Sequence, residues 1–328
     1  MLRPIPLLVL LIILSTLSFI LAFSVGSYQL SIPQLSDAFL SSEPSIAHTL
    51  VWELRAPRAY VAFITGALLS LAGVLMQVLL RNPLADPYIL GVSGGASVAA
   101  LSAMFLGLSA SWLPISAFTG AFVSILLVFS LAHGQGSWQP TRLLLTGVVI
   151  AAGWGALINF ILSISPDKPL KGMLFWIMGD ISGSSAHISS LIVLLLGAGI
   201  CFIIARQLNI LARGDLQAGA LGVSVKPMRI SLFLLASALT AFAVVQAGSV
   251  GFVGLIVPHM LRLISGSDHR LLIPASILLG GSLLVISDTL ARTIIAPQQL
   301  PVGVITAFIG VPFFLFLLNR NFNRQLST

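Results

Sequence analysis

Long stretches of this chain carry no charged residue, and four of them are each near or above the length that crosses a lipid bilayer as one helix. About 20 apolar residues suffice for one crossing, and the four stretches are Ala59–Leu80, Leu143–Pro166, Ile181–Ala205 and Thr293–Asn319. Hydrophobic residues make up 57% of the 328 residues and charged residues only 8%, against roughly 25% charged in a soluble domain. So few charges cannot cover a water-exposed surface. The sequence therefore predicts an all-α polytopic membrane protein and excludes soluble enzymes and secreted scaffolds.

Turn signals divide the apolar sequence into about ten transmembrane helices. Ser109–Pro114, for example, divides an uncharged stretch that is too long for one crossing. We expect residues 1–328 to form a single transmembrane domain. The predicted helices cover residues 5–25, 59–80, 88–107, 113–132, 141–163, 186–206, 230–247, a short helix that ends near 263, 271–286 and 302–318.

The segments between these helices have distinct characters. Residues 37–58 are expected to form a polar connection, and residues 208–229 form the longest basic connection. Residues 173–178 predict a short amphipathic helix at the membrane surface, where Trp176 suits the headgroup region. Glycines at 248, 251 and 254 weaken any helix, so a turn or a broken helix is expected there.

The distribution of Lys and Arg predicts which way the chain is oriented, because cytoplasmic connections of membrane proteins are enriched in these residues. With the N-terminus inside, eleven of the 16 basic residues fall in inner connections and the other five in outer ones. Both termini are therefore expected in the cytoplasm. The basic residues form no run or stripe, so the net charge of +7 does not indicate a nucleic-acid partner.

The chain lacks the motifs of an energy source or a metal centre. A P-loop needs a lysine followed by Ser or Thr, whereas Lys168 and Lys226 precede proline and Lys171 precedes glycine. The five histidines are far apart and show no metal-ligand spacing. Charged groups are absent from the middle of the spans, which disfavours an ion-coupled carrier. We therefore expect a transport component that is not itself an enzyme and that depends on an energy-consuming partner.

Four segments together resemble the permease subunits of bacterial ATP-binding-cassette (ABC) importers for iron chelates, haem and vitamin B12. In the order of that family they are LRAPR at 54–58, RNPLADPYILGVSGGA at 81–96, GDLQAGALGV at 214–223 and GFVGLIVPHMLR at 251–262. The resemblance implies a type II ABC importer permease fold, no cofactor, and a location in the bacterial cytoplasmic (inner) membrane, surrounded by lipid. It also implies a homodimer with the pore between the two copies, two cytoplasmic ATPase subunits, and a periplasmic or lipid-anchored substrate-binding protein.

The third segment matches the coupling helix that fits into a groove on the ATPase subunit in this family. Two glycines bracket a short amphipathic piece, and an acidic residue near its N-terminus is favoured by the helix dipole. An ordinary polar loop is the alternative interpretation. The expected coupling residues are Gly214, Asp215, Leu216, Ala218, Leu221 and Gly222.

Arginines at the positions of Arg55, Arg58 and Arg292 meet glutamates of the binding protein in this family, so the resemblance implies that these residues face outward and dock that partner. Guanidinium–carboxylate pairs suit such a transient, electrostatically steered complex. The alternatives are anchoring at the lipid headgroups or local pairing with Glu53 and Asp288.

Other positions are implied to form a gate or to pack helices together. Asn82, Leu84 and Thr141 match residues that constrict the cytoplasmic end of the pathway, although Asn82-Pro83 also suits a turn that ends a helix. A Gly-xxx-Gly spacing predicts tight helix packing at Gly91, Gly94 and Gly95. Three uncharged polar residues lie within predicted spans: Gln77, Asn159 and Gln246. They could form hydrogen bonds between helices or line the pore.

The leading hypothesis is therefore a permease that imports an iron chelate, either a siderophore or haem. Residues 84–88 look more like the iron-chelate permeases than the cobalamin permeases. One alternative is the same fold importing vitamin B12 (cobalamin). Another, from a different class, is an ion-coupled secondary carrier that acts alone.

Overall fold

The computed structural model describes residues 4–26, 28, 30–40, 45–132, 140–183 and 186–326, and this part of the chain contains helices and no strands. The helices, in chain order, are α1 (Pro4–Ser24), α2 (Ile32–Leu40), α3 (Ile46–Thr49), the π-helix η1 (Leu50–Arg55), α4 (Ala56–Leu79), the 3₁₀-helix η2 (Pro87–Leu90), α5 (Val92–Phe105), α6 (Trp112–Ala132), α7 (Pro140–Ile164), α8 (Asp167–Ile177), α9 (Ile188–Ile203), α10 (Ala205–Leu211), α11 (Asp215–Ala220), α12 (Val225–Ala247), α13 (Val253–Ser265), α14 (His269–Thr293) and α15 (Val302–Leu326).

Every predicted span corresponds to a helix of the structure. In the described part of the chain, six helices are long and apolar enough to cross a membrane, or seven if the pair α9–α10, bent by 61°, is one span. The described residues hold three shorter apolar helices as well, in α5, α13 and the first part of α15. These add up to the ten apolar segments that the sequence predicts, and residues 248–252 are non-helical as expected.

Three connections differ from their predictions. The expected polar connection at 37–58 is largely helical, because Ser45 caps α3 by accepting a hydrogen bond from the His48 amide (3.1 Å) and the turns continue through η1 into α4. The basic connection at 208–229 contains the end of α10 and the separate helix α11. The surface helix predicted at 173–178 is α8, which begins earlier, at Asp167. Glu43 and Pro44, in the first of these connections, lie outside the described residues.

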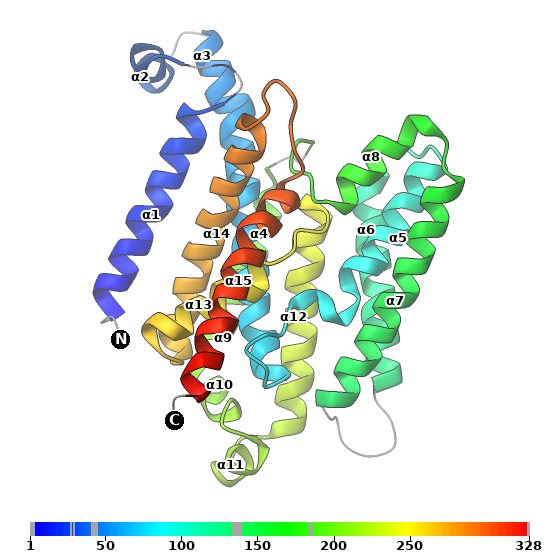
Figure 1. Ribbon diagram of the computed structural model, residues 1–328, viewed down its shortest axis with the longest axis vertical. Helices are drawn as coiled ribbons and strands as arrows, with labels where there is room; N and C mark the ends of the chain where they lie inside the picture. The colour runs from blue at the N-terminus through cyan, green and yellow to red at the C-terminus, as the bar shows by residue number, and fades with distance from the viewer. Residues whose placement is uncertain are drawn as a thin grey trace.

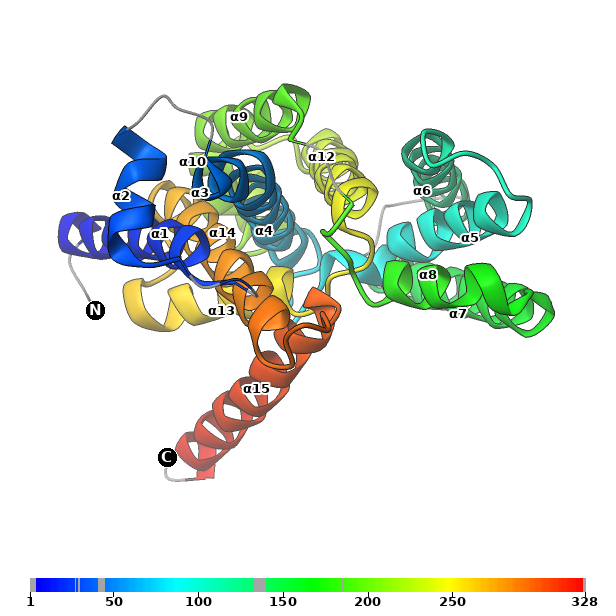
Figure 2. The same ribbon diagram turned by 90° about the horizontal axis from the view of Figure 1, so that it is seen from above.

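Helix α4 lies at the centre of the molecule and packs against α12, α13 and α14 (Figures 1 and 2). Glycines allow the backbones to approach closely. A Cβ added to Gly66 would lie 2.2 Å from the Gly280 carbonyl oxygen of α14, and a Cβ at Gly73 would lie 1.9 Å from that of Gly254 in α13. Small residues at such crossings let helices pack by van der Waals contact where lipid supplies no hydrophobic drive.

The short helices α5 and α13 begin inside the bundle, beside each other. Gly91 and Phe252, which precede them, both have φ 70, in the left-handed region. The Val250 amide donates a hydrogen bond to the Tyr88 hydroxyl (3.0 Å) and so joins the two helix starts. Both broken segments are enclosed by protein, where irregular backbone can be tolerated in a membrane.

The described chain has two distinct ends, which we name by their helices. Figure 1 shows α11 at the lower end, with α1 beginning and α15 finishing toward it, and α2, α3 and α8 at the upper end. Seen from above, α5, α6, α7 and α8 form a group of their own beside the helices around α4, and α15 projects away from both (Figure 2). We refer to these ends as the α11 end and the α8 end.

The glycine contacts predict the effect of adding one methyl group. A Cβ at Gly95 of α5 would lie 2.4 Å from the Gly120 carbonyl oxygen of α6, whereas a Cβ at Gly199 of α9 would meet nothing within 4 Å. We expect Gly95→Ala to lower the free energy of unfolding by about 1–3 kcal/mol, because backbone atoms cannot move aside. Gly199→Ala is the matched control and should be neutral or slightly stabilising. Thermal unfolding of both purified variants checks this, and equal midpoints would contradict the close contact.

Candidate transport pathway and partner contacts

Helix α11 projects from one end of the bundle (Figure 1) and offers apolar side chains to a partner. Leu216 is 92% exposed and Leu221 is 62% exposed, whereas Ala218 is buried against the rest of the chain. Gly214 (φ 121) and Gly222 (φ 81) bracket the helix in conformations that residues with a side chain rarely adopt. The coupling residues predicted from the sequence therefore form one compact unit, and their contact with an ATPase stays a prediction.

Asp215, the first residue of α11, connects this helix to two others. Its carboxylate forms ion pairs with Arg81, which follows α4, and with Arg229 of α12 (2.9 Å). Arg229 is only 4% exposed, so its charge depends on such a partner. Arg81 has φ 49, which is unusual for a residue other than glycine. Because Arg81 directly precedes Asn82, Asp215 ties α11 to the α4–α5 connection.

The predicted gate residues lie at the α11 end on two separate segments. The Asn82 side-chain oxygen accepts a hydrogen bond from the Leu84 amide (2.9 Å), so the helix-ending turn expected from Asn-Pro is present. Thr141 is exposed in the first turn of α7, and among the described residues no hydrogen bond joins it to the other two. Asp86 caps η2 by accepting from the Tyr88 amide (2.7 Å), and burial raises the pKa of Asp86 to about 6. A gating role stays a prediction.

The three arginines expected on the outer side all contact other parts of the chain, and two of them are buried. Arg55 is 4% exposed and Arg292 is 7% exposed. The Arg55 guanidinium donates to the backbone carbonyls of Ser24 (3.1 Å) and Tyr28 after α1. Arg58 keeps some exposure, 14% of its side chain. Docking of a binding protein by these arginines stays a prediction.

Asp288 of α14 is the acid that pairs with two of these arginines. Its carboxylate accepts from the Arg58 Nε at 3.0 Å and from the Arg58 Nη2 at 2.9 Å. Arg292, one turn further along α14, places its Nε 3.3 Å from the other carboxylate oxygen. Arg58 also donates to the Gln299 side chain (2.9 Å). The local pairing with Asp288 that the sequence suggested as an alternative is therefore present.

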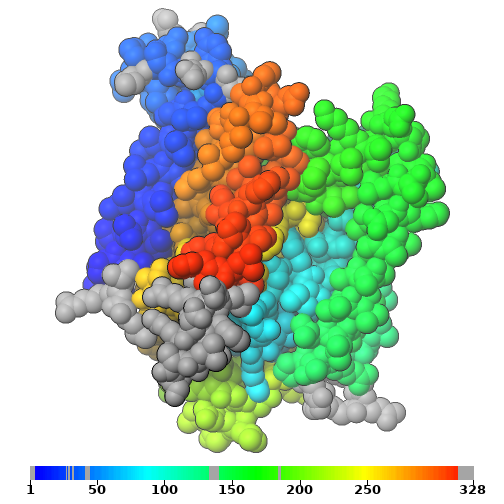
Figure 3. Space-filling view, viewed as in Figure 1, coloured from blue at the N-terminus to red at the C-terminus, as the bar shows by residue number. Residues whose placement is uncertain are grey.

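A cavity of about 810 Å³ opens at the α8 end, between α8 and the α14–α15 connection. Figure 3 shows the molecular surface hollowed between the α14–α15 side and the α7–α8 side. Polar side chains line the cavity at Lys171, Asp180, Gln298 and Gln299. Because Gln299 also binds Arg58, the cavity lies next to the Arg58–Asp288 ion pair.

Two of the uncharged polar residues within the spans join helices. The Gln77 side chain of α4 donates to the Leu255 carbonyl of α13 (3.1 Å) and accepts from Arg262 of α13. Gln246 of α12 pairs with the Ser190 hydroxyl of α9. For these two residues the structure therefore shows interhelical hydrogen bonds, one of the two alternatives that the sequence left open.

A polar contact that sequence analysis missed anchors α10 to α14. The Asn209 side chain donates to Asp268 (2.8 Å) and accepts from the His269 amide (2.9 Å). Asp268 also caps α14 by accepting from the Arg270 amide (3.0 Å). Both hydrogen bonds favour the ionised form and lower the pKa of Asp268. An Asp directly before an apolar helix was the signal that could have predicted the cap.

Comparison with known proteins agrees with this arrangement of helices. The model of the FecCD transport family matches residues 10–320. The chain belongs to this family. A solved structure of a metal-chelate type ABC transporter in an inward-facing conformation superposes with a TM-score of 0.84 at 30% identity, and the match covers 95% of this chain and 98% of that one.

Curated relatives are similar over most of their length. The chain is 43% identical to the Fe(3+) dicitrate transport system permease protein FecD of Escherichia coli (strain K12), over 83% of this chain and 85% of that protein. It is 40% identical to the hemin transport system permease protein HmuU of Yersinia pestis, over 82% and 83%. It is also 40% identical to the cobalamin import system permease protein BtuC of Halobacterium salinarum, over 86% and 77%.

These matches confirm the predicted class of protein. The chain is a multi-pass permease subunit of an ABC importer with the type II importer permease fold. Permease subunits are not themselves enzymes, since a separate subunit hydrolyses ATP. Membership of the family also implies a substrate-binding partner.

The ion pairs of Asp215 predict how α11 is held in place. We expect Asp215→Asn to weaken the attachment of α11 by about 1–3 kcal/mol, because the buried Arg229 loses its carboxylate partner. Hydrogen exchange of residues 212–224 should become faster, and the exchange of α4 should not change. Asp215→Glu keeps the charge, and Asp167→Asn makes the same change at the α8 end, so both controls should exchange like the wild type. Unaltered exchange in Asp215→Asn would show that the ion pairs do not hold α11.

Proposed function

We propose that this chain forms the membrane pathway of an importer for an iron chelate, either a siderophore or haem. Its support is similarity over 83% and 82% of the chain to permeases named for ferric dicitrate and hemin, together with a solved metal-chelate type transporter of the same fold. The similarity to a cobalamin permease is nearly as high. Vitamin B12 is therefore the second candidate substrate for the same pathway.

The partner expected at the α11 end is the ATPase subunit, two copies of which serve the complete importer. The exposed side chains of α11 support this assignment, because Leu216 in this six-residue helix and Leu221 directly after it are largely exposed. Apolar side chains displayed in this way mark protein–protein contacts. The Asp215–Arg81 ion pair then passes a displacement of α11 to the gate residues Asn82 and Leu84. Thr141, in the first turn of α7, is the third proposed gate residue.

The second copy of this chain is expected against α7 and α15. Both helices expose large apolar side chains, among them Val149 and Phe160 of α7 and Phe308 of α15. Gly153 and Gly155 on α7 have no atom within 4 Å of an added Cβ, which leaves room for a closely packed helix. We therefore propose a homodimer with the pathway between the two copies. Asn159, exposed on α7, would lie at that interface.

The α8 end is where the substrate-binding protein would dock. Arg55, Arg58 and Arg292 supply three positive charges there and Asp288 one negative charge, so the cluster carries a positive excess for acidic residues of a partner. The adjacent cavity of about 810 Å³ would receive the chelate as the binding protein releases it. In this proposal Arg58, the most accessible of the three, makes the direct contact.

The orientation that follows places the α11 end and both termini in the cytoplasm. The basic residues Arg81, Arg142, Arg206, Arg213 and Lys226 lie in or beside connections of the α11 end, in agreement with an excess of positive charge on the cytoplasmic side. Residues 1–328 act as one transmembrane domain.

Reconstitution tests the transport proposal. We expect proteoliposomes that hold this chain, its ATPase subunit and its binding protein to take up radiolabelled ferric dicitrate or haemin only when ATP is present. Cyanocobalamin uptake at an equal or higher rate would assign the pathway to the second candidate substrate. Uptake driven by a proton or sodium gradient into liposomes with this chain alone would overturn the importer proposal.

Thiol labelling tests the orientation. In a chain with Cys201→Ala, we expect an impermeant maleimide added to whole cells to label Ser111→Cys, which lies between α5 and α6, and to leave Ser267→Cys between α13 and α14 unlabelled. Both positions are exposed in the structure, so burial does not explain a difference. After the cells are opened, both variants should be labelled. The reverse pattern in whole cells would invert the proposed orientation.

A further inference from the structure

A bend in one span opens a groove on the side of the molecule. Helix α9 ends at Ile203, and α10 continues at an angle of 61°. Ile204 at the break has φ −88 and ψ 4, outside the helical region. Asn209 then holds α10 against the start of α14 through Asp268 and His269. The space between the α9–α10 segment and the first half of α12 is left open, and residues of both line it.

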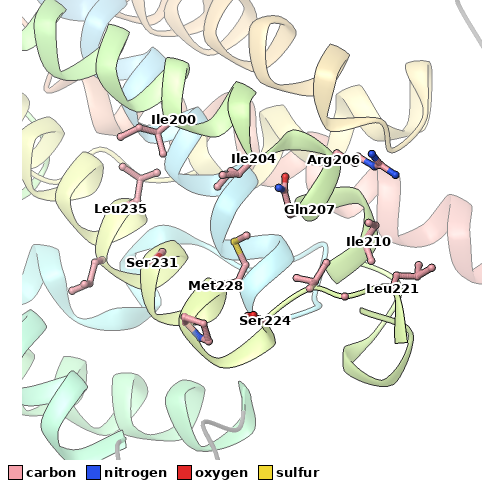
Figure 4. A pocket seen from close by; sticks show the side chains of 14 residues that line it. Ile200, Ile204, Arg206, Gln207, Ile210, Leu221, Ser224, Met228, Ser231 and Leu235 are labelled. Atoms are coloured by element: carbon pink, nitrogen blue, oxygen red, sulfur yellow. The ribbon is translucent and has the colours of Figure 1, made fainter. Parts of the chain in front are cut away.

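The resulting α9–α12 groove has a volume of about 970 Å³. Apolar side chains line most of it, with Ile200 on α9 and Ile204 at the break facing Met228 and Leu235 on α12 (Figure 4). The polar lining residues are Arg206, Gln207, Ser224 and Ser231. Met228, Ser231 and Leu235 are spaced i, i+3, i+7, so they lie along one face of α12 over two turns. The groove therefore runs along this face of α12, and its lining is mainly apolar.

The surroundings of the groove face lipid. Phe202 (57% exposed) and Ile203 (79% exposed) lie on α9 beside it, and Leu234 on α12 is exposed as well. Apolar side chains of spanning helices have this exposure where they contact acyl chains. Water forms no hydrogen bonds with apolar side chains, whereas an acyl chain packs against them. Because the groove opens sideways into the bilayer, an acyl chain is its natural occupant.

Positive charge gathers where the groove reaches the α11 end. Residues 205–231 hold Arg206, Arg213, Lys226 and Arg229 and a single acid, Asp215. The Asp215 carboxylate is already paired with Arg81 and Arg229. Arg206 lines the groove and Lys226 precedes its lining residue Pro227. Both are exposed, and in the part of the chain that the structure describes neither forms an ion pair. Acidic side chains are absent from the lining.

We propose that the α9–α12 groove binds one anionic phospholipid from the leaflet at the α11 end. One acyl chain lies between α9 and α12, and the phosphate contacts Arg206 and Lys226. Basic residues at a membrane surface attract anionic headgroups in this way. Leu221, Gly222, Val223 and Ser224, which follow α11, form the end of the groove. The bound lipid therefore supports the segment that positions α11, a consequence that rests on the proposed coupling role.

Native mass spectrometry of the purified, delipidated chain measures the binding directly. With palmitoyl-oleoyl phosphatidylglycerol we expect one tightly held lipid per chain, and with the phosphatidylcholine of the same chains roughly tenfold weaker binding. Arg206→Gln combined with Lys226→Gln should weaken phosphatidylglycerol binding by roughly tenfold or more, since both phosphate contacts are lost. Arg270→Gln removes an exposed charge from the same end, outside the groove lining, and should bind like the wild type.

Filling the groove tests the position of the acyl chain. Ser231 is exposed and lines the groove, so Ser231→Trp should block the lipid without disturbing the core, and Ser231→Ala should not. Circular dichroism and dimer mass check that both variants are folded. Equal binding of the two lipids, or full phosphatidylglycerol binding by both the double variant and Ser231→Trp, would overturn the proposal.

A competing occupant is the ATPase subunit. If added ATPase subunit displaces phosphatidylglycerol from the wild type, and Ser231→Trp weakens ATPase binding, the groove belongs to that protein interface and the lipid proposal is overturned. The lipid measurement uses the permease alone. Its result therefore stands whether or not the complete importer carries an iron chelate.

Discussion

Backbone contact along α4 is the constraint on which the rest of the structure depends. A lipid bilayer offers apolar groups no gain from burial against protein, so helices associate through close packing and hydrogen bonds. Gly66 and Gly73 of α4 bring its backbone against Gly280 of α14 and Gly254 of α13. Any side chain at these positions would separate the helices. The broken helix α13 can begin inside the bundle because α4 covers its first residues.

Both ends of the described bundle carry an ion-pair cluster, and each cluster places one carboxylate between two arginines. Asp288 lies between Arg58 and Arg292 at the α8 end, and Asp215 lies between Arg81 and Arg229 at the α11 end. A buried arginine is costly without a carboxylate, so these acids fix which helices meet there. One ion-pair cluster adjoins the cavity at the α8 end, and the other adjoins the helix that extends beyond the bundle.

The bend between α9 and α10 relates the membrane part to its proposed partner contact. A straight helix through residues 188–211 would run past α12 and leave no room for the groove. The Asn209 contact with α14 fixes the bend, and α11 follows it directly. The same bend therefore creates the lateral groove and brings α11 to the surface. As a result, the groove that faces lipid lies directly beside the proposed coupling segment.

Periodic and compositional features were sufficient to predict the ten apolar spans and their approximate limits. Long uncharged segments have only one stable form in a bilayer, since a helix satisfies its own backbone groups. The spacing of Gly91, Gly94 and Gly95 predicted a close helix crossing, and the glycines at 248–254 predicted a break in a helix. Both predictions need only local sequence, because the missing side chain of glycine affects the backbone at its own position. The helical structure of residues 45–55 was missed, because Glu53, Arg55 and Pro57 suggested a polar connection, whereas the turns continue into α4.

Tertiary structure alone decided the surroundings of the charged residues. Arg55, Arg58 and Arg292 match a docking pattern by their positions in the sequence, yet two of them are buried against backbone carbonyls and Asp288. The partners of Arg55 are backbone carbonyls at and after the end of α1. Arg58 binds Asp288 of α14 and Gln299 after it, both more than 200 residues further along the chain. Sequence spacing determines which residues share a helix face. Which helices then bring opposite charges together depends on packing across the whole bundle, and only the folded chain supplies that.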